Sequence, residues 1–221
     1  LSRIFGELIT LLEPDKRKGK PNEMSARLPY SQDRLTLPSN LYVIGTMNTA
    51  DRSIALLDTA LRRRFQFEEM MPDGDVIKDQ LTEALDADAE SSGSEASFTL
   101  SEAQIGLINT AFETLNERIT ALVDRDHQIG HSYFLGIESM ADLREVWYQE
   151  SLPLLQEYFY EDRRRLVAVL GRYDPEAQKG FVQTEEPTDL LGDGVGGSEP
   201  IWDFHKFQTG ELETALRNTF T

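Results

Sequence analysis

The most informative segment of the sequence reads Leu41-Tyr-Val-Ile-Gly-Thr-Met-Asn-Thr-Ala-Asp-Arg-Ser53. Its apolar run, Leu41 to Ile44, is typical of a strand buried on both faces, as in a parallel sheet. A polar cluster follows where this strand is expected to end. In open α/β sheets, ligands bind beyond the carboxyl ends of the strands. We therefore predict that Asn48 and Asp51 lie where a ligand binds.

A helix and a group of arginines follow the polar cluster. Leu57 and Leu61 lie one turn apart on one face of the predicted helix. Arg62, Arg63 and Arg64 come at its end. Arginines there offset the partial negative charge of the helix C-terminus, and their planar guanidinium groups suit phosphate. The group is either a solvated basic helix end or a phosphate-binding element.

Two of these stretches, Met47–Ser53 and Leu61–Phe65, together resemble the signature of McrB-type AAA+ proteins. Members of this family are the NTPase, usually GTPase, motor subunits of modification-dependent restriction systems. Three further stretches agree, so that the resemblance runs from the first residue to Leu170. They are Ile4-Phe-Gly-Glu-Leu8, Ile129-Gly-His-Ser-Tyr-Phe134 and Leu152-Pro-Leu-Leu-Gln-Glu-Tyr-Phe159.

The resemblance implies that this chain is part of a larger module. Neither the phosphate-cradling pattern Gly-x-x-x-x-Gly-Lys-Ser/Thr nor an apolar strand ending in Asp-Glu occurs in the 221 residues. In the family, both precede the Ile-Phe-Gly-Glu helix. We therefore expect an α/β fragment, with part of the parallel sheet of a P-loop NTPase (AAA+) followed by a mainly α-helical lid. The expected division is 1–72 for the α/β core, 73–175 for the lid and 176–221 for a C-terminal extension.

The resemblance also implies roles for individual residues. Asn48 and Asp51 are expected to position the attacking water, and Asn48 and Thr49 to contact the nucleotide. Arg63 or Arg64 is expected to act as an arginine finger on the nucleotide of a neighbouring subunit, where charge accumulates on the transferring phosphoryl oxygens. Position alone leaves simpler readings open: Asn48 as a turn residue that bonds its own backbone, and Asp51 as a helix N-cap.

A second polar stretch lies in the expected lid. AAA+ lids usually carry an arginine near this point, whereas here His131 and Ser132 follow Gly130. The resemblance makes His131 and Ser132 candidates for nucleotide contact, and a structural histidine is the alternative. His127 and His131 have helical spacing, but Gly130 lies between them and no third ligand is evident, so no metal site is expected.

Composition limits the class of protein. The net charge of −17 argues against independent binding of nucleic acid, because such binding depends on neutralising phosphates. The absence of cysteine fits a reducing cytoplasm, and no apolar run approaches the roughly 18 residues of a membrane span. We expect a cytoplasmic protein that makes no contact with a membrane.

The expected partners follow from the resemblance. The complete protein should form a ring of its own copies, with a hexamer expected, and should use GTP or ATP with Mg²⁺. A nuclease subunit should join the ring, and DNA should be held by other parts of the complex. No cofactor should bind tightly to this chain, and the chain alone should not hydrolyse nucleotide. Two rival interpretations are a non-catalytic acidic binding or decoy protein, and an ATP-driven AAA+ remodeller with no restriction role.

The remaining elements are predicted from local patterns. Ser101 and Gln104 have the spacing of a capping box, and they precede a stripe of apolar residues at helical spacing from Ile105 to Leu122. Ser151 is predicted to cap a helix that has Pro153 in its first turn. Other predicted elements are a hairpin within 27–43, a strand from Phe65, helices over 76–85, 140–149 and 211–220, a solvated connection over 86–97 and a strand over 201–204.

Overall fold

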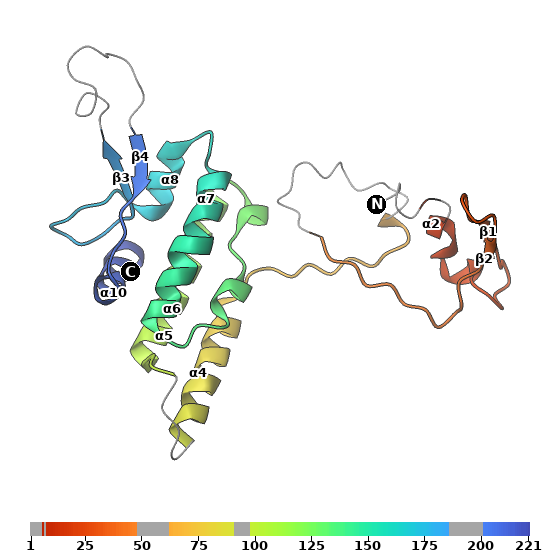
Figure 1. Ribbon diagram of the computed structural model, residues 1–221, viewed down its shortest axis with the longest axis horizontal. Coiled ribbons are helices and arrows are strands. Elements are labelled where there is room, and N and C mark those ends of the chain that lie inside the picture. The colour runs from red at the N-terminus through yellow and green to blue at the C-terminus, as the bar shows by residue number, and fades with distance from the viewer. Residues whose placement is uncertain (1–5, 7, 48–61, 91–97, 186–200) are drawn as a thin grey trace, which may run out of the picture. The chain divides into compact units, whose positions relative to one another are not determined.

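The computed structural model describes residues 6, 8–47, 62–90, 98–185 and 201–221, and the chain forms two compact units (Figure 1). The first unit comprises residues 1–70 and the second residues 71–221. The second unit is mostly helical and carries one small sheet. Among the described residues, no helix is both long enough and apolar enough to cross a membrane.

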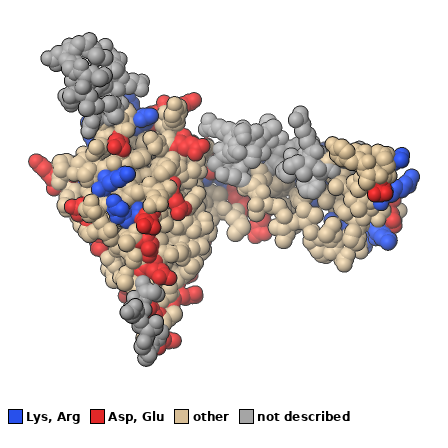
Figure 2. Space-filling model, viewed as in Figure 1, with Lys and Arg blue, Asp and Glu red and all other residues tan. Residues whose placement is uncertain are grey.

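The two units differ sharply in charge. Residues 1–70 contain 11 Lys and Arg against 9 Asp and Glu, a net charge of +2, whereas residues 71–221 contain 11 against 30, a net charge of −19. Figure 2 shows many acidic side chains over the visible face of the second unit, with Lys and Arg among them, and side chains of both signs on the first. The acidity of the chain therefore belongs to the second unit alone.

The first unit contains a short hairpin. Strand β1 (Ala26–Arg27) pairs antiparallel with β2 (Arg34–Leu35), so that Ala26 lies opposite Leu35. This confirms the predicted hairpin. Helix α2 (Leu8–Leu11) and the 3₁₀ turn η1 (Pro14–Lys16) precede it.

The prediction of a strand at Leu41–Ile44 is wrong for this structure. These residues have no regular secondary structure, and Tyr42 and Ile44 are 85% and 94% exposed. A strand exists only where a neighbour satisfies its N–H and C=O groups. No described residue pairs with this run, and the strand predicted from Phe65 fails for the same reason. The described residues hold two antiparallel two-stranded sheets, and the expected parallel sheet is not among them.

The core of the second unit is organised around helix α5 (Glu102–Leu122). Ser101 and Gln104 form the predicted capping box, in which the Gln104 N–H donates to the Ser101 side chain and the Ser101 N–H donates to Gln104 Oε1. The predicted stripe faces inward: Ile105, Ile108, Phe112, Leu115 and Ile119 are buried, and Leu122 packs partly buried against them.

Helix α4 (Gly74–Glu90) packs against α5 and includes the helix predicted over 76–85. It also continues through residues 86–90, which were assigned to a solvated connection. Ala and Glu within that stretch are strong helix formers and extend the helix. Residues 91–97 lie outside the described part of the chain.

Helices α6 (Met140–Glu145) and α7 (Leu152–Tyr158) are joined by a π-helical segment, η4 (Val146–Ser151). The predicted Ser151 cap is therefore wrong. Ser151 has helical backbone angles, its side chain makes no capping bond, and its Oγ atom is buried without a partner. Pro153 lacks an N–H and disturbs the i→i−4 pattern of the preceding turn, which accounts for the wider π-helical turns at this point.

The C-terminal elements complete the same core. Helix α8 (Arg163–Leu170) packs against α5, and strands β3 (Val182–Glu185) and β4 (Ile201–Phe204) pair antiparallel. Helix α10 (Thr209–Phe220) packs against α5 and α6. The strand over 201–204 and the terminal helix are confirmed.

Tyr148 holds the segment between β4 and α10 in place. Its hydroxyl accepts a hydrogen bond from the Phe207 N–H (2.9 Å) and donates one to the His205 carbonyl (3.1 Å). Arg144 reinforces the clamp by donating from Nε to the Phe207 carbonyl. Burial raises the pKa of the Tyr148 hydroxyl from 10.0 to about 12.

Tyr148→Phe is expected to lower the free energy of unfolding by about 1–3 kcal/mol at neutral pH, because the buried Phe207 N–H loses its acceptor. The folded-state pKa lies above the unfolded value, so the contribution of the hydroxyl is complete below pH 10 and is lost as pH rises through about 12. Urea unfolding at pH 7, 10 and 11.5 should therefore show the gap between wild type and variant narrowing. A gap that stays constant over this range would contradict the assignment.

Candidate functional site

The structure places the predicted site residues in three separate groups. Asn48, Thr49 and Asp51 lie outside the described residues. Arg63 and Arg64 belong to the first unit, and His131 and Ser132 to the second.

Arg64 and Arg63 have different surroundings. The Nη2 atom of Arg64 lies 2.6 Å from Oε1 of Glu13, and the Arg64 side chain is only 16% exposed. Arg62 and Arg63, in contrast, are exposed. A guanidinium held by a carboxylate of its own chain is less available to a phosphate. The geometry therefore favours Arg63 over Arg64 for contact with another subunit.

His131 lies in the 3₁₀ turn η3 (His131–Phe134) and contacts the start of α4. Its Nδ1 atom accepts a hydrogen bond from the Asp73 N–H at 3.1 Å. A ring nitrogen that accepts carries no proton, so the neutral tautomer has its proton on Nε2. The half-buried ring can thus offer its Nε2–H donor to a ligand.

Ser132 faces a different environment. It lines a hollow of about 400 Å³ together with three carboxylate side chains, Asp142, Glu145 and Glu150. Carboxylates at such short range oppose the approach of a phosphate. His131 is not among the residues that line this hollow. Of the two predicted contacts in the lid, His131 therefore has the more suitable surroundings.

His127 has a structural role. Its Nδ1 atom lies 2.6 Å from Oδ1 of Asp124, and its ring packs edge-on against Tyr158. Burial acts to raise the pKa of Asp124, but the hydrogen bond and charge of His127 outweigh it and lower that pKa. Asp124 also accepts from the N–H groups of Asp126 and His127, and so caps the short helix η2 (Arg125–His127). Within the described ranges, no three His, Cys, Asp or Glu side chains are placed to hold a metal ion.

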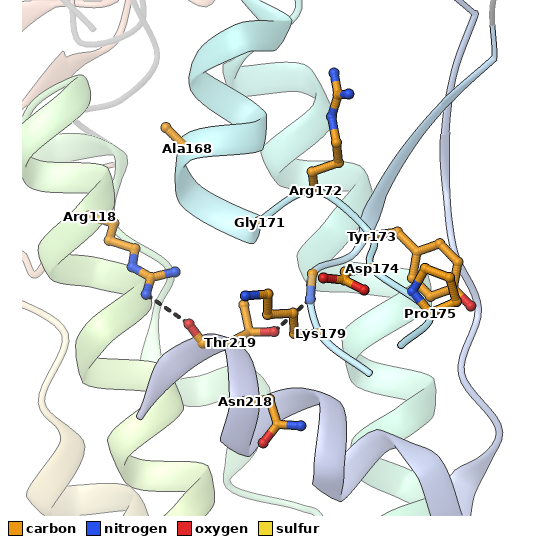
Figure 3. A pocket seen from close by; sticks show the side chains of 11 residues that line it. Arg118, Ala168, Gly171, Arg172, Tyr173, Asp174, Pro175, Lys179, Asn218 and Thr219 are labelled. Carbon is orange, nitrogen blue, oxygen red and sulfur yellow. Dashed lines mark hydrogen bonds between the residues drawn. The ribbon is translucent and has the colours of Figure 1, made fainter. Parts of the chain in front are cut away.

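A cavity that was not predicted from the sequence has a volume of about 770 Å³ (Figure 3). It lies where α5, the loop after α8 and the end of α10 meet. Two glycines make this approach possible: Gly171 and Gly180 have φ angles of +75° and +71°, and a Cβ on Gly171 would lie 3.0 Å from the Gly180 Cα. These two glycines were the only feature of the sequence that could have indicated the cavity. The lining residues are Arg118, Ala168, Gly171, Arg172, Tyr173, Asp174, Pro175, Lys179, Gly180, Asn218 and Thr219.

Comparison with known proteins identifies relatives in restriction systems. The chain is 38% identical over 171 residues to the type IV methyl-directed restriction enzyme EcoKMcrB subunit of Escherichia coli strain K12. That match covers 73% of this chain but 35% of the relative, so the chain spans about a third of the relative's length. It is also 35% identical over 74 residues to the type II restriction enzyme BsuMI component YdiS of Bacillus subtilis strain 168, covering 29% of this chain and 22% of that protein.

A family model for the α-helical lid domain of McrB matches residues 107–167. The matched range begins within α5 and ends within α8, so it covers the middle of the second unit and leaves out α4 and α10. It includes His127, His131 and Ser132. The lid model and the long match to EcoKMcrB agree with the resemblance carried by the polar cluster and the arginines. The chain is a McrB-type protein, and its second unit carries the McrB α-helical lid.

Proposed function

We propose that this chain is the lid-bearing part of a ring-forming NTPase, with GTP favoured over ATP, that powers cleavage of modified DNA together with a nuclease subunit. The observation that carries the proposal is the 38% identity over 171 residues to a subunit of a methyl-directed restriction enzyme. That relative is a subunit of a restriction enzyme, and the match extends over most of the length of this chain.

The proposed catalytic roles are divided between two neighbouring copies. Asn48 and Asp51 position the attacking water in their own subunit, because an amide and a carboxylate can orient water beside a terminal phosphate. Arg63 reaches the nucleotide of the next subunit, which its exposure allows. His131 offers its Nε2–H to the nucleotide from the lid.

The remaining catalytic groups belong to the rest of the complete protein. The sequence of this chain lacks the phosphate loop, and its described residues include no carboxylate cluster suited to Mg²⁺. When bound, Mg²⁺ would neutralise charge on the β- and γ-phosphates.

A second candidate function is an acidic binding module. The net charge of −19 on residues 71–221 favours it, since a surface of this kind attracts basic partners and repels DNA. The two functions differ in their dependence on residues of the first unit. Only the NTPase requires Asn48 and Arg63.

The proposal is tested by nucleotide turnover. The complete protein should hydrolyse GTP faster than ATP, and the 221-residue chain alone should hydrolyse neither. Asn48→Ala should lower turnover roughly 10²–10³-fold, the usual cost of removing one positioned donor near a reacting group. Asn40→Ala removes the same amide from an exposed position before the predicted strand and should leave the rate unchanged. Absence of hydrolysis by the complete protein would favour the acidic binding module.

A further inference from the structure

The 770 Å³ cavity concentrates positive charge in an acidic unit. Residues 71–221 carry 11 basic side chains, and three of them, Arg118, Arg172 and Lys179, line this cavity. The lining has one carboxylate, Asp174. The side chains around the cavity therefore sum to +2 in a unit whose net charge is −19. Its volume lies within the usual range of small-molecule sites, about 300–1,000 Å³.

Arg118 fixes one wall of the cavity. It donates from Nη1 to the Val169 carbonyl (2.9 Å) and from Nη2 to the Thr219 carbonyl (2.8 Å). These carbonyls belong to the last turns of α8 and α10, whose partial negative charges would otherwise face the cavity. The positive charge of Arg118 offsets the partial negative charge at the ends of both helices. Those ends therefore do not cancel the positive charges of Arg172 and Lys179.

The opposite wall is held by the loop after α8. The Gly180 N–H donates to Thr219 Oγ1 (2.8 Å), and the Asn218 amide donates to the Ala177 carbonyl (2.8 Å). Asp174 closes a turn of this loop, because its Oδ1 accepts from the N–H groups of Glu176 and Ala177. The loop therefore holds a fixed shape beside α10.

Lys179 is the cation available to a ligand. Figure 3 shows its side chain running across the middle of the cavity, between Gly171 and Thr219, whereas Arg172 extends from the rim. No ion pair involves Lys179 or Arg172 within the part of the chain that the structure describes. An ammonium group without a counter-ion, directed into a hollow, favours an anion.

We propose that this cavity binds a compact phosphoryl anion, a free phosphate or pyrophosphate group or that of a small phosphate ester, with Lys179 as the principal contact. A phosphoryl group carries a charge of about −1.5 to −2 at neutral pH, opposite in sign to the net charge of the lining. A polyanion such as DNA fits less well, because its further phosphates would meet the surrounding carboxylates. The site uses neither His131 nor Ser132 and does not depend on the proposed NTPase activity.

The test measures binding of pyrophosphate to the 221-residue chain by isothermal titration at constant ionic strength. Wild type should bind one equivalent, and Lys179→Gln should weaken binding at least 10-fold. Lys206→Gln is the matched control, because it removes the same charge from an exposed position outside the cavity lining. It should change the affinity less than twofold. Circular dichroism and thermal unfolding should show that both variants keep the wild-type fold.

Any one of the following results would overturn the proposal. The first is the absence of saturable binding by wild type. The second is equal weakening by the two lysine variants, which would indicate a general effect of charge. The third is equal affinity for malonate, which would show that the cavity does not distinguish a phosphoryl group from carboxylates. AMP serves as the phosphate-ester probe: binding at the same site, competed by pyrophosphate and lost in Lys179→Gln, supports the proposal, and AMP binding that survives Lys179→Gln counts against it.

Discussion

Arg63→Ala in the complete protein is expected to lower nucleotide turnover roughly 10³–10⁵-fold, the range found for the loss of an arginine finger. The reason is that charge accumulates on the transferring phosphoryl oxygens and a guanidinium in trans stabilises it. Arg63 is exposed, as a residue that reaches another subunit must be. The measurement is steady-state GTP hydrolysis, with nucleotide binding followed separately so that a loss of affinity is not mistaken for a loss of rate.

Two controls separate a finger from a general basic patch. Arg62→Ala removes the neighbouring exposed charge and should change the rate by less than about threefold. Arg63→Ala mixed with Asn48→Ala should recover part of the activity, because some interfaces then combine an intact Asn48 with an intact Arg63. Failure of the mixture to exceed either variant alone would exclude action in trans.

Arg64 is expected to respond differently from Arg63. Its contact with Glu13 lies within its own unit, so Arg64→Ala should act mainly on stability. Partly exposed ion pairs contribute about 1 kcal/mol or less. Glu13→Gln should reproduce that loss without affecting turnover. A Glu13 variant as inactive as Arg63→Ala would contradict this division of roles.

Gly180→Ala is expected to destabilise the second unit by about 2–5 kcal/mol, a large part of the stability of an ordinary domain. A Cβ at this position would lie 2.1 Å from the Arg172 carbonyl oxygen and 2.4 Å from the Arg172 carbonyl carbon, and both are backbone atoms that cannot rotate away. The positive φ of +71° adds strain for any L side chain. Urea unfolding should show a lower midpoint with an unchanged slope.

The matched control is Gly106→Ala. Gly106 is exposed within α5, and a Cβ there would meet no atom within 4 Å apart from its chain neighbours and the nearby backbone of its own helix. Alanine should therefore stabilise the helix by about 0.5–1 kcal/mol. The same substitution is thus expected to act in opposite directions at two positions. Equal effects at both would show that the loop after α8 does not pack as described.

Local patterns were enough to predict α4, α5 and α10 of the second unit. The capping box at Ser101 and the stripe along α5 depend on residues three and four apart, and both are visible in a single sequence. The π-helical turns before Pro153 were not predicted, because the local pattern at Ser151 equally suits a new helix. Ser151 is buried within a continuous helix because of tertiary packing, which the local sequence does not show.

Features that depend on distant partners could not be predicted in the same way. The apolar run Leu41–Ile44 has the composition of a buried strand, but a strand also needs neighbours, and no described residue supplies one. The 770 Å³ cavity depends on the approach of Gly171 to Gly180 and on the contacts of both the loop and α5 with Thr219. The polar cluster at Asn48 remains a prediction from sequence, because it lies outside the described residues.

The bonds between α5 and the end of α10 span almost half of the chain. Thr114 donates to the Phe220 carbonyl across 106 positions, and Arg118 donates to the Thr219 carbonyl across 101. During translation, these partners are therefore synthesised after α5, with a delay of roughly 5–20 s at about 5–20 residues per second. Throughout that interval the apolar face of α5 is not yet covered by α10. An exposed apolar face is the type of surface that molecular chaperones recognise.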